Sequence, residues 1–315
     1  MEVSSAGRDM KEAPSHTTNR DTTLNLPCQG PAMPVPESTP SRAQPMAITP
    51  GGALAVLAGR ECRAIDRALA NTRNRHAGIH RARKGIRSLR AILALAEPMP
   101  DHATRRIDRR LRKLARGLSA LRDAFVAMQT AQSLAVGGSA APWHAPAVAL
   151  EEVCNQALRS ALATDPDFAA RRSELGRIRQ ALSALPWERV SPQAMARALK
   201  RSQRRTKRSE DDARRRDTVG LLHRWRRRLR RLRLQLDAMA KASAMSPYVV
   251  DPAHPRRHMR ELKRMTDALG RQQDLRLLRR HLARLDADHR SPAQLRLELR
   301  NATADAARAT AELAG

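Results

Sequence analysis

Aromatic residues, cysteines and lysines are scarce in this chain of 315 residues. Phenylalanine, tryptophan and tyrosine make up 2% of it, so the core has to be built from aliphatic side chains, which favours helices over β-sheets. The three cysteines, Cys28, Cys62 and Cys154, are widely spaced and predict neither a disulfide framework nor a zinc site. We expect no metal site and no cofactor.

Positive charge, by contrast, is abundant. The chain has 60 Lys+Arg against 31 Asp+Glu, a formal net charge of +29, and only seven of the cations are lysines. Arginine presents a planar fork that can bond two phosphate oxygens at once, whereas lysine is a point charge. Codon use in a GC-rich genome can raise the arginine share, but it does not explain the net charge. A polyanionic partner is therefore the leading hypothesis.

The first 50 residues differ from the rest of the chain. They carry four cations and five anions, and seven prolines fall between Leu26 and Pro50. This composition predicts a disordered Pro-rich tail over residues 1–50. The start lacks the basic and apolar segments of a secretory signal, and the long uncharged stretch 124–150 is interrupted by glycines and prolines. The expected compartment is the cytoplasm.

From residue 51 onward the apolar residues recur with helical spacing, interrupted by proline and glycine. At two of the predicted helix starts, Ser191-Pro192 and Ser291-Pro292, a capping hydroxyl precedes a proline at the first helical position. No segment alternates apolar and polar residues over the length of a strand, so the predicted fold class is all-α. We predict helices over 52–72, 75–97, 102–134, 146–164, 167–184, 192–217, 218–243, 255–286 and 292–314.

The chain also contains an internal repeat. The segment HRARKGIRSLR, which begins at His80, aligns with HRWRRRLRRLR, which begins at His223, at an offset of 143 residues. Cations coincide at four positions and aliphatic residues at four more. On a helix, the histidine and its cations would cover a sector of about 120° beside the apolar stripe. Each of these helices is therefore predicted to bury one side and to present a row of positive charge on its flank.

A second pair of segments matches at an offset of 151 residues. Five cations between Arg105 and Lys113 align with five between Arg256 and Arg264, and downstream Asp123 aligns with Asp274. Two copies of the same helical order predict two pseudo-symmetric four-helix bundles, a duplicated helical unit. The expected organisation is a tail over 1–50 and a helical domain over 51–315, whose halves are about 51–185 and 186–315.

The repeated motif His-x-x-Arg-(Lys/Arg)-x-x-Arg-x-x-Arg, followed each time by Leu-(Gly/Ser)-x-x-(Arg/Gln)-Asp, resembles the CHAD domain, or conserved histidine α-helical domain. The resemblance covers roughly residues 51–314. It implies paired helical bundles whose basic central surface binds inorganic polyphosphate, and association with polyphosphate granules. Ser88 stands where many family members carry arginine, so the first half is expected to bind a polyanion less strongly. The Glu-x-Glu-x-Lys motif of the triphosphate tunnel enzymes that often precede this domain does not occur, which predicts a standalone module.

We expect the ligand to be bound by the repeated cations and the two histidines. In the first half these residues are His80, Arg83, Lys84, Arg87, Arg90, Arg105, Arg106, Arg109, Arg112 and Lys113. In the second half they are His223, Arg226, Arg227, Arg230, Arg231, Arg233, Arg256, Arg257, Arg260, Lys263 and Arg264.

The histidines and the aspartates of the repeat need separate interpretations. Neighbouring cations should lower the pKa values of His80 and His223, and contact with the ligand or with an arginine is favoured over simple packing and over catalysis. Asp123 and Asp274 are interpreted as structural carboxylates that orient a cation, because no second carboxylate recurs beside them to form a catalytic pair. We interpret the charged run 201–216 as a solvated helix face, since its acidic residues suit pairing one turn apart.

The predicted function is non-enzymatic binding of inorganic polyphosphate, or another linear polyanion, in a basic groove between the bundles. A nucleic-acid-binding protein is the main alternative, given a sequence pI near 11.7, although few aromatics are available to stack on bases. A histidine-dependent phosphatase or phosphotransferase is a further alternative without a supporting carboxylate or metal cluster. A membrane partner is not expected, because bundle packing should bury the apolar stripes.

Overall fold

The computed structural model describes residues 47–96, 101–137, 141–216, 218–250, 256–285 and 293–314. Regular structure in these residues is entirely helical, which confirms the all-α prediction; most of the predicted tail lies outside them. Two short 3-10 turns, Pro166–Phe168 and Trp187–Arg189, flank α6. The α-helices are α1 (Pro50–Ala70), α2 (Arg75–Leu93), α3 (Asp101–Gly117), α4 (Ser119–Gly137), α5 (Ala141–Thr164), α6 (Ala169–Ser183), α7 (Pro192–Arg216), α8 (Val219–Ser243), α9 (Arg256–Leu285) and α10 (Ala293–Ala314).

Side-chain caps fix several helix starts. The Thr49 hydroxyl accepts a hydrogen bond from the Gly52 amide at 3.0 Å, and the Asn74 side chain accepts one from the Ala77 amide at 2.9 Å. The predicted cap at Ser191 is confirmed, because its hydroxyl accepts from the Ala194 amide at 3.2 Å. The other predicted cap, Ser291, lies outside the described residues. Local sequence therefore decides where these helices begin.

The single helix predicted over 102–134 is wrong, since the chain breaks between α3 and α4 at Leu118. Glycine weakens a helix interior, and Gly117 lies directly before the break. The carbonyl of Ala115 also accepts hydrogen bonds from Ser119 Oγ at 3.2 Å and from the guanidinium of Arg83. These competing donors stabilise the end of α3. The corresponding stretch of the second half runs without interruption through α9.

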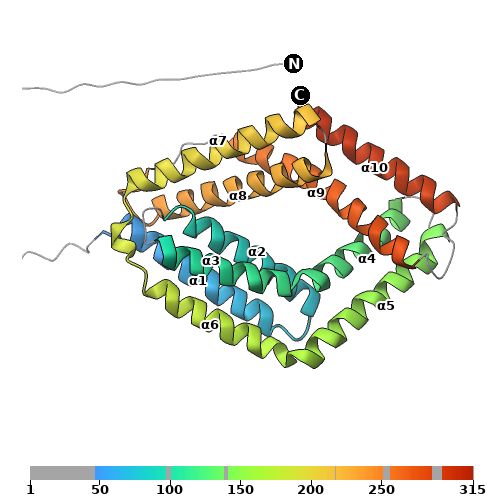
Figure 1. Ribbon diagram of the computed structural model, residues 1–315, viewed down its shortest axis with the longest axis horizontal. Coiled ribbons are helices and arrows are strands. Elements are labelled where there is room, and N and C mark those ends of the chain that lie inside the picture. Colours follow the sequence, from blue (N-terminus) through green and yellow to red (C-terminus); the bar gives the residue numbers. More distant parts are fainter. Residues whose placement is uncertain are drawn as a thin grey trace, which may run out of the picture. The chain divides into compact units, whose positions relative to one another are not determined.

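The two halves repeat the same order of helices. The order of helices in the first half is α1, α2, α3 with α4, and α5, and the second half repeats it as α7, α8, α9 and α10. The two sequence offsets match α2 to α8 and α3 to α9. The helices with the repeated histidines, α2 and α8, pack side by side, as do α4 and α9 (Figure 1). The duplicated helical unit is thus present, and its two copies meet along equivalent helices.

Both halves contribute to shared cores. The larger core joins α1, α2 and α3 to α8 through residues such as Ile79, Ile86, Leu229 and Leu232, all of which are buried. A smaller core joins α4 and α5 to α9 and α10, and Trp143 lies fully buried in it. The indole of Trp143 donates a hydrogen bond to the carboxylate of Glu298 at 2.6 Å. Because α2 and α8 bury their aliphatic stripes in one core, their arginine-rich flanks face each other.

Candidate functional site

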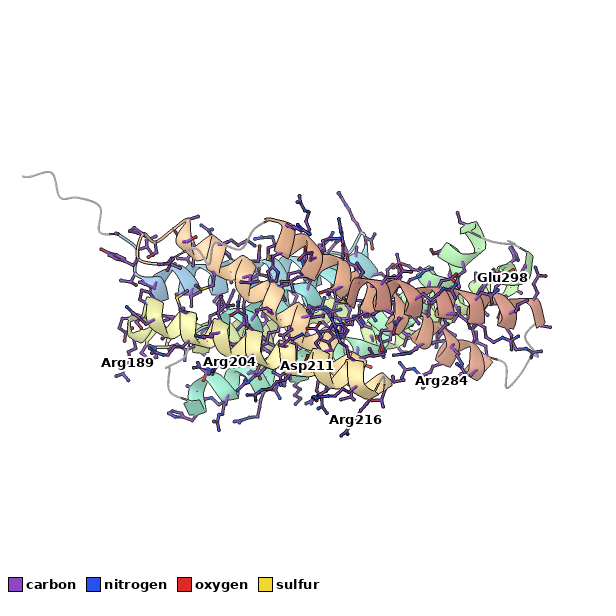
Figure 2. The ribbon with its side chains drawn as sticks, turned by 90° about the horizontal axis from the view of Figure 1, so that it is seen from above. Arg189, Arg204, Asp211, Arg216, Arg284 and Glu298 are labelled. Atoms are coloured by element: carbon purple, nitrogen blue, oxygen red, sulfur yellow. The ribbon has the colours of Figure 1, made fainter. Side chains whose placement is uncertain are left out.

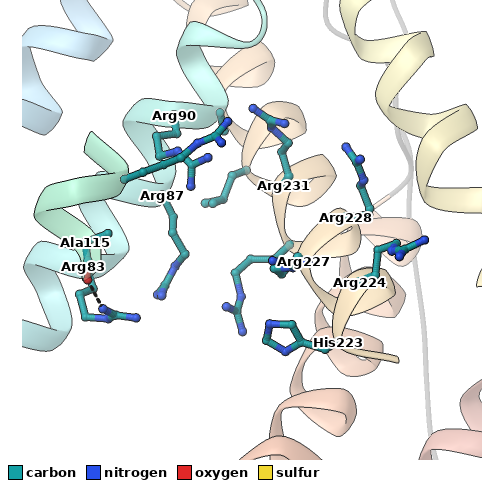
Figure 3. Close-up of a pocket in the computed structure, with 13 residues that line it drawn as sticks. Arg83, Arg87, Arg90, Ala115, His223, Arg224, Arg227, Arg228 and Arg231 are labelled. Atoms are coloured by element: carbon teal, nitrogen blue, oxygen red, sulfur yellow. Dashed lines mark hydrogen bonds between the residues drawn. The ribbon is translucent and has the colours of Figure 1, made fainter. Parts of the chain in front are cut away.

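The main functional candidate is a groove of about 540 Å³ between α2, α3 and α8, which we call the first groove. Nine arginines and one histidine line it, together with small or aliphatic residues, and no carboxylate does. Figure 3 shows Arg83, Arg87 and Arg90 of α2 facing Arg227, Arg231 and His223 of α8. The full lining is Arg83, Arg87, Arg90, Ala91, Arg112, Ala115, His223, Arg224, Arg227, Arg228, Arg230, Arg231 and Leu234.

The arginines of the first groove differ from the other arginines of the chain in where they lie. The chain carries arginines over much of its outer surface, and Arg189, Arg204, Arg216 and Arg284 are exposed there (Figure 2). In the first groove the helical repeat places cations three or four residues apart on the flank beside the buried stripe. Two such helices side by side therefore concentrate positive charge in one concave region.

Burial and mutual repulsion disfavour the charged form of the arginines in the first groove. Burial is the main cause that lowers the pKa of Arg87 to about 10, and the charges of Arg83, Arg122 and Arg226 lower it further. Burial likewise lowers the pKa of Arg230 to about 9, and the charges of Arg226 and Arg87 lower it further. A guanidinium retains its proton under ordinary conditions, so this repulsion is not relieved by deprotonation. An anion bound in the groove would relieve it.

In and beside the first groove, several guanidinium donors are buried. Among the described residues, the Nε atoms of Arg83, Arg226 and Arg233 are buried without a hydrogen-bond partner. Arg226 is only 8% exposed and lies across Gly270, where an added Cβ would be 2.9 Å from its Nη2 atom. Arg83 is better satisfied, because it donates to the Ala115 carbonyl and to Ser119 Oγ, the latter at 2.9 Å.

The two aspartates of the repeat meet at one arginine. Arg122 of α4 contacts Asp123 through Nη1 and Asp274 of α9 through Nη2, each at 3.2 Å. The sequence interpretation assigned these aspartates an orienting role but did not name Arg122, because its counterpart in the repeat is Gln273. The available signal was its position directly before the repeated aspartate. Arg122 also contributes to the positive charge around Arg87 and Arg230.

The two repeated histidines occupy different positions. His223 lines the first groove, whereas His80 is exposed and lies outside its lining. Partial burial of the ring lowers the pKa of each imidazole, and nearby cations lower it further, chiefly Arg87 beside His80 and Arg227 beside His223. A hydrogen bond between His223 and the side chain of Gln273 acts in the opposite direction and raises the pKa of His223. Both imidazoles are therefore biased toward the neutral form.

A second groove, of about 400 Å³, adjoins the first. Arg90, Arg112 and Arg231 line both grooves, and the second continues over α3 and α7. Its full lining is Arg90, Leu93, Ala94, Thr104, Arg105, Asp108, Arg109, Arg112, Ala198, Arg201, Ser202, Arg205 and Arg231.

The charged run 201–216, which we interpreted as a solvated helix face, also borders the second groove at its start. Arg201 and Arg205 line the second groove, because α7 packs along α8 and turns this end of its charged face toward α3. Later in the run the expected pairs do occur: Lys207 contacts Asp211 at 3.3 Å, and Arg214 contacts Glu210 at 2.6 Å. The acidic residues of the run, Glu210, Asp211 and Asp212, all lie in its later part, and this difference between the two ends was the available sequence signal.

Of the described cations in the second repeated set, only members of the first-half copy line a groove. In the first half, Arg105, Arg109 and Arg112 line the second groove, whereas Arg106 and Lys113 are exposed and line neither. In the second half, Arg257, Arg260, Lys263 and Arg264 are all exposed outside both grooves, and the side chain of Arg256 lies outside the described residues. Arg257 and Lys263 instead contact carboxylates one turn along α9, at 3.0 and 2.7 Å.

The remaining predicted residues lie beside the first groove. Lys84 is exposed, and Arg226 and Arg233 lie beneath the surface of α8, outside both linings. Ser88, the counterpart of Arg231, donates a hydrogen bond to the carboxylate of Glu61 at 2.9 Å. It faces a small cavity that also includes Asp237. The repeat thus produces a basic groove on one face, whereas the cavity at the equivalent position is lined by two acidic residues, Glu61 and Asp237, and two basic ones, Arg60 and Lys241.

Other sites are not apparent in the part of the chain that the structure describes. No three of its His, Cys, Asp and Glu residues lie close enough together to hold a metal ion. Cys154 contacts His76 at 3.6 Å, but burial raises the pKa of its thiol to about 11, which disfavours a reactive thiolate. None of the described helices is both long and apolar enough to cross a membrane.

Comparison with known families agrees with this geometry. The sequence profile of the CHAD domain matches residues 58–283, a span that holds α2, α8 and both grooves. The chain belongs to the CHAD domain family. Comparison with curated protein sequences finds no significant match.

Solved structures show the same fold. The CHAD domain of the plant Ricinus communis matches with a TM-score of 0.59 and 18% identity, covering 87% of this chain and 92% of the plant chain. PptA from Streptomyces chartreusis matches with a TM-score of 0.52 and 17% identity, covering 84% of this chain and 95% of PptA. Since the helical order is retained at such low identity, the CHAD fold tolerates extensive replacement of its side chains.

Proposed function

We propose that this CHAD protein binds inorganic polyphosphate in the first groove without altering it chemically. The observation that carries the proposal is the lining itself: nine arginines, one histidine and no carboxylate around one groove. Arginine binds phosphate oxygens by charge-assisted hydrogen bonds, often two at a time. A polymer with a negative charge on every unit matches a row of such side chains.

The energetics of the groove support the same ligand. Arg87 and Arg230 repel their neighbours, and burial weakens their hydration. A polyanion would replace this repulsion with attraction, in a site already ordered by helix packing. Binding sites often lower the stability of the free protein, because their residues are selected for function and not for stability.

A nucleic acid is the competing polyanion. Base recognition in single strands relies on aromatic stacking, and the first groove contains no aromatic ring except the imidazole of His223. Polyphosphate offers charge without bases and needs no such platform. We therefore favour polyphosphate over DNA or RNA.

The residues that line the first groove favour binding of polyphosphate over a chemical reaction on it. His223 is the one lining residue with an ionisable group suited to proton transfer near neutral pH, and the groove offers no carboxylate or hydroxyl to act with it. Polyphosphate incubated with the protein should keep its chain length on a gel. Shortening that disappears in H223Q would instead support the phosphatase alternative.

A competition assay tests the choice of ligand. Fluorescently labelled polyphosphate is bound to the full chain, and unlabelled polyphosphate, duplex DNA or single-stranded RNA is added at equal phosphate concentration and fixed salt. We expect polyphosphate to displace the label at a concentration at least tenfold lower than either nucleic acid. Equal or better displacement by DNA or RNA would contradict the proposed function.

A further inference from the structure

The first and second grooves adjoin each other. Arg90 of α2, Arg112 of α3 and Arg231 of α8 line both, so these three side chains form the boundary between the two spaces. Beyond this junction the second groove runs between α3 and α7, where Arg105, Arg109, Arg201 and Arg205 line it. Arginines therefore follow one another from α8 to α7 across the junction.

The junction is ordered by a carboxylate. Asp108 accepts a hydrogen bond from Nε of Arg90 at 2.6 Å, and its second oxygen contacts Arg112 at 2.5 Å. Each guanidinium has five N–H donors, and these contacts use only part of them. Asp108 therefore holds two arginines in place and leaves donors on both that can reach a ligand.

The two grooves differ in charge. Seven arginines and one aspartate line the second groove, whereas nine arginines and no acidic residue line the first. A short anion should therefore prefer the first groove. Only a ligand long enough to pass the junction would gain contacts with α3 and α7 as well.

We propose that the two grooves form one continuous path for a linear polyanion, in which the second groove makes affinity depend on chain length. The inference rests on the proposed function and extends it, since it names the class of polyphosphate that the protein would favour. Tripolyphosphate would occupy the first groove alone. Long-chain polyphosphate would occupy both and would gain the additional arginine contacts.

Paired substitutions separate the two grooves. R109A/R205A removes two exposed cations from the second groove, and R224A/R227A removes two exposed cations from the first. R296A/R300A removes two exposed cations from α10, which lines neither groove, and serves as the charge-matched control. Circular dichroism would confirm that all three variants retain the helical fold.

Titration calorimetry then measures the affinity of the wild type and of each variant for tripolyphosphate and for long-chain polyphosphate. We expect R109A/R205A to weaken long-chain binding by about tenfold or more and to change tripolyphosphate binding by less than about twofold. R224A/R227A should weaken both. The salt dependence of long-chain binding should also become shallower in R109A/R205A, by about 1 to 2 in slope.

Two other results would overturn the inference. Equal weakening of both ligands by R109A/R205A would mean that the second groove does not sense chain length, and no weakening would mean that the ligand does not enter it. If the wild-type protein bound neither ligand, the proposed function would fail together with the inference. The wild-type titrations alone distinguish that case.

Discussion

Arg87 and Arg230 are the residues at which binding and stability oppose each other most directly. Both are half-buried, and each lies among further arginines of the two central helices. Proteins usually pair buried charges, whereas Asp274, the carboxylate that acts on Arg230, already contacts Arg122. The positive charge is thus retained at a cost to the unliganded fold.

Substitution of Arg230 by glutamine should therefore stabilise the protein. We expect R230Q to raise the free energy of unfolding by about 0.5–2 kcal/mol without ligand, because it removes a repelling charge. It should also weaken polyphosphate binding. Urea denaturation followed by circular dichroism measures the first effect, and a variant that unfolds at lower urea than the wild type would contradict the account.

His223 should make both stability and binding depend on pH. Since its pKa in the folded protein lies below the ordinary value of 6.5, the unfolded chain binds more protons at acidic pH. The free energy of unfolding should therefore fall as the pH decreases below about 6.5. A bound polyanion favours the imidazolium, so affinity should rise severalfold over the same range.

The variant H223Q isolates the contribution of His223 to the pH dependence of polyphosphate binding. It keeps a hydrogen-bonding side chain in the groove but cannot gain a proton, so its affinity for polyphosphate should vary less between about pH 7.5 and 5.5 than that of the wild type. His80 and the ligand titrate equally in both proteins and cancel in the comparison. Identical pH profiles would show that His223 does not face the bound anion.

At the scale of elements, the aliphatic stripes and the repeat predicted that α2 and α8 are helices. They also predicted which side of each helix carries the arginines. These features follow from periodicity, which a sequence displays directly. Gly117 was the one sequence signal for the break at Leu118, and the break also depends on Arg83 reaching the Ala115 carbonyl from another helix. The roles of Arg122, Arg201 and Arg205 likewise depend on which helix packs opposite them, and periodicity does not show this.

The close packing of α1 against α2 permits a test at this scale. A Cβ on Gly85 would be 2.6 Å from Cγ1 of Ile65, so G85A should destabilise the fold by about 1–3 kcal/mol. On α6, a Cβ on Gly176 would meet nothing within 4 Å, and G176A should stabilise by up to about 1 kcal/mol through helix propensity. Urea denaturation measures both, and similar effects of the two variants would contradict the packing of α1 on α2.

For the whole molecule, a symmetric sequence has produced an asymmetric surface. The repeat predicted cations in equivalent places, yet Arg231 lines both grooves whereas its counterpart Ser88 contacts Glu61. In the same way, Arg109 and Arg112 line a groove whereas Arg260 and Lys263 face solvent. Net charge therefore describes this protein poorly. The proposed function instead depends on which arginines the helices bring to one side.

The most direct test of this claim compares two variants with equal net charge. One replaces Arg87, Arg227, Arg230 and Arg231, which line the first groove, by alanine. The other replaces Arg159, Arg216, Arg296 and Arg300, which are exposed and line neither groove. Both keep the buried aliphatic stripes, and circular dichroism would verify that both are folded.

The measurement is the affinity for long-chain polyphosphate at one fixed salt concentration. A preorganised groove predicts a loss of at least about 100-fold in the first variant, because several charge-assisted contacts disappear together. The second variant should lose less than about fivefold, since only the overall field changes. Equal losses in two folded variants would contradict the groove as the site of binding.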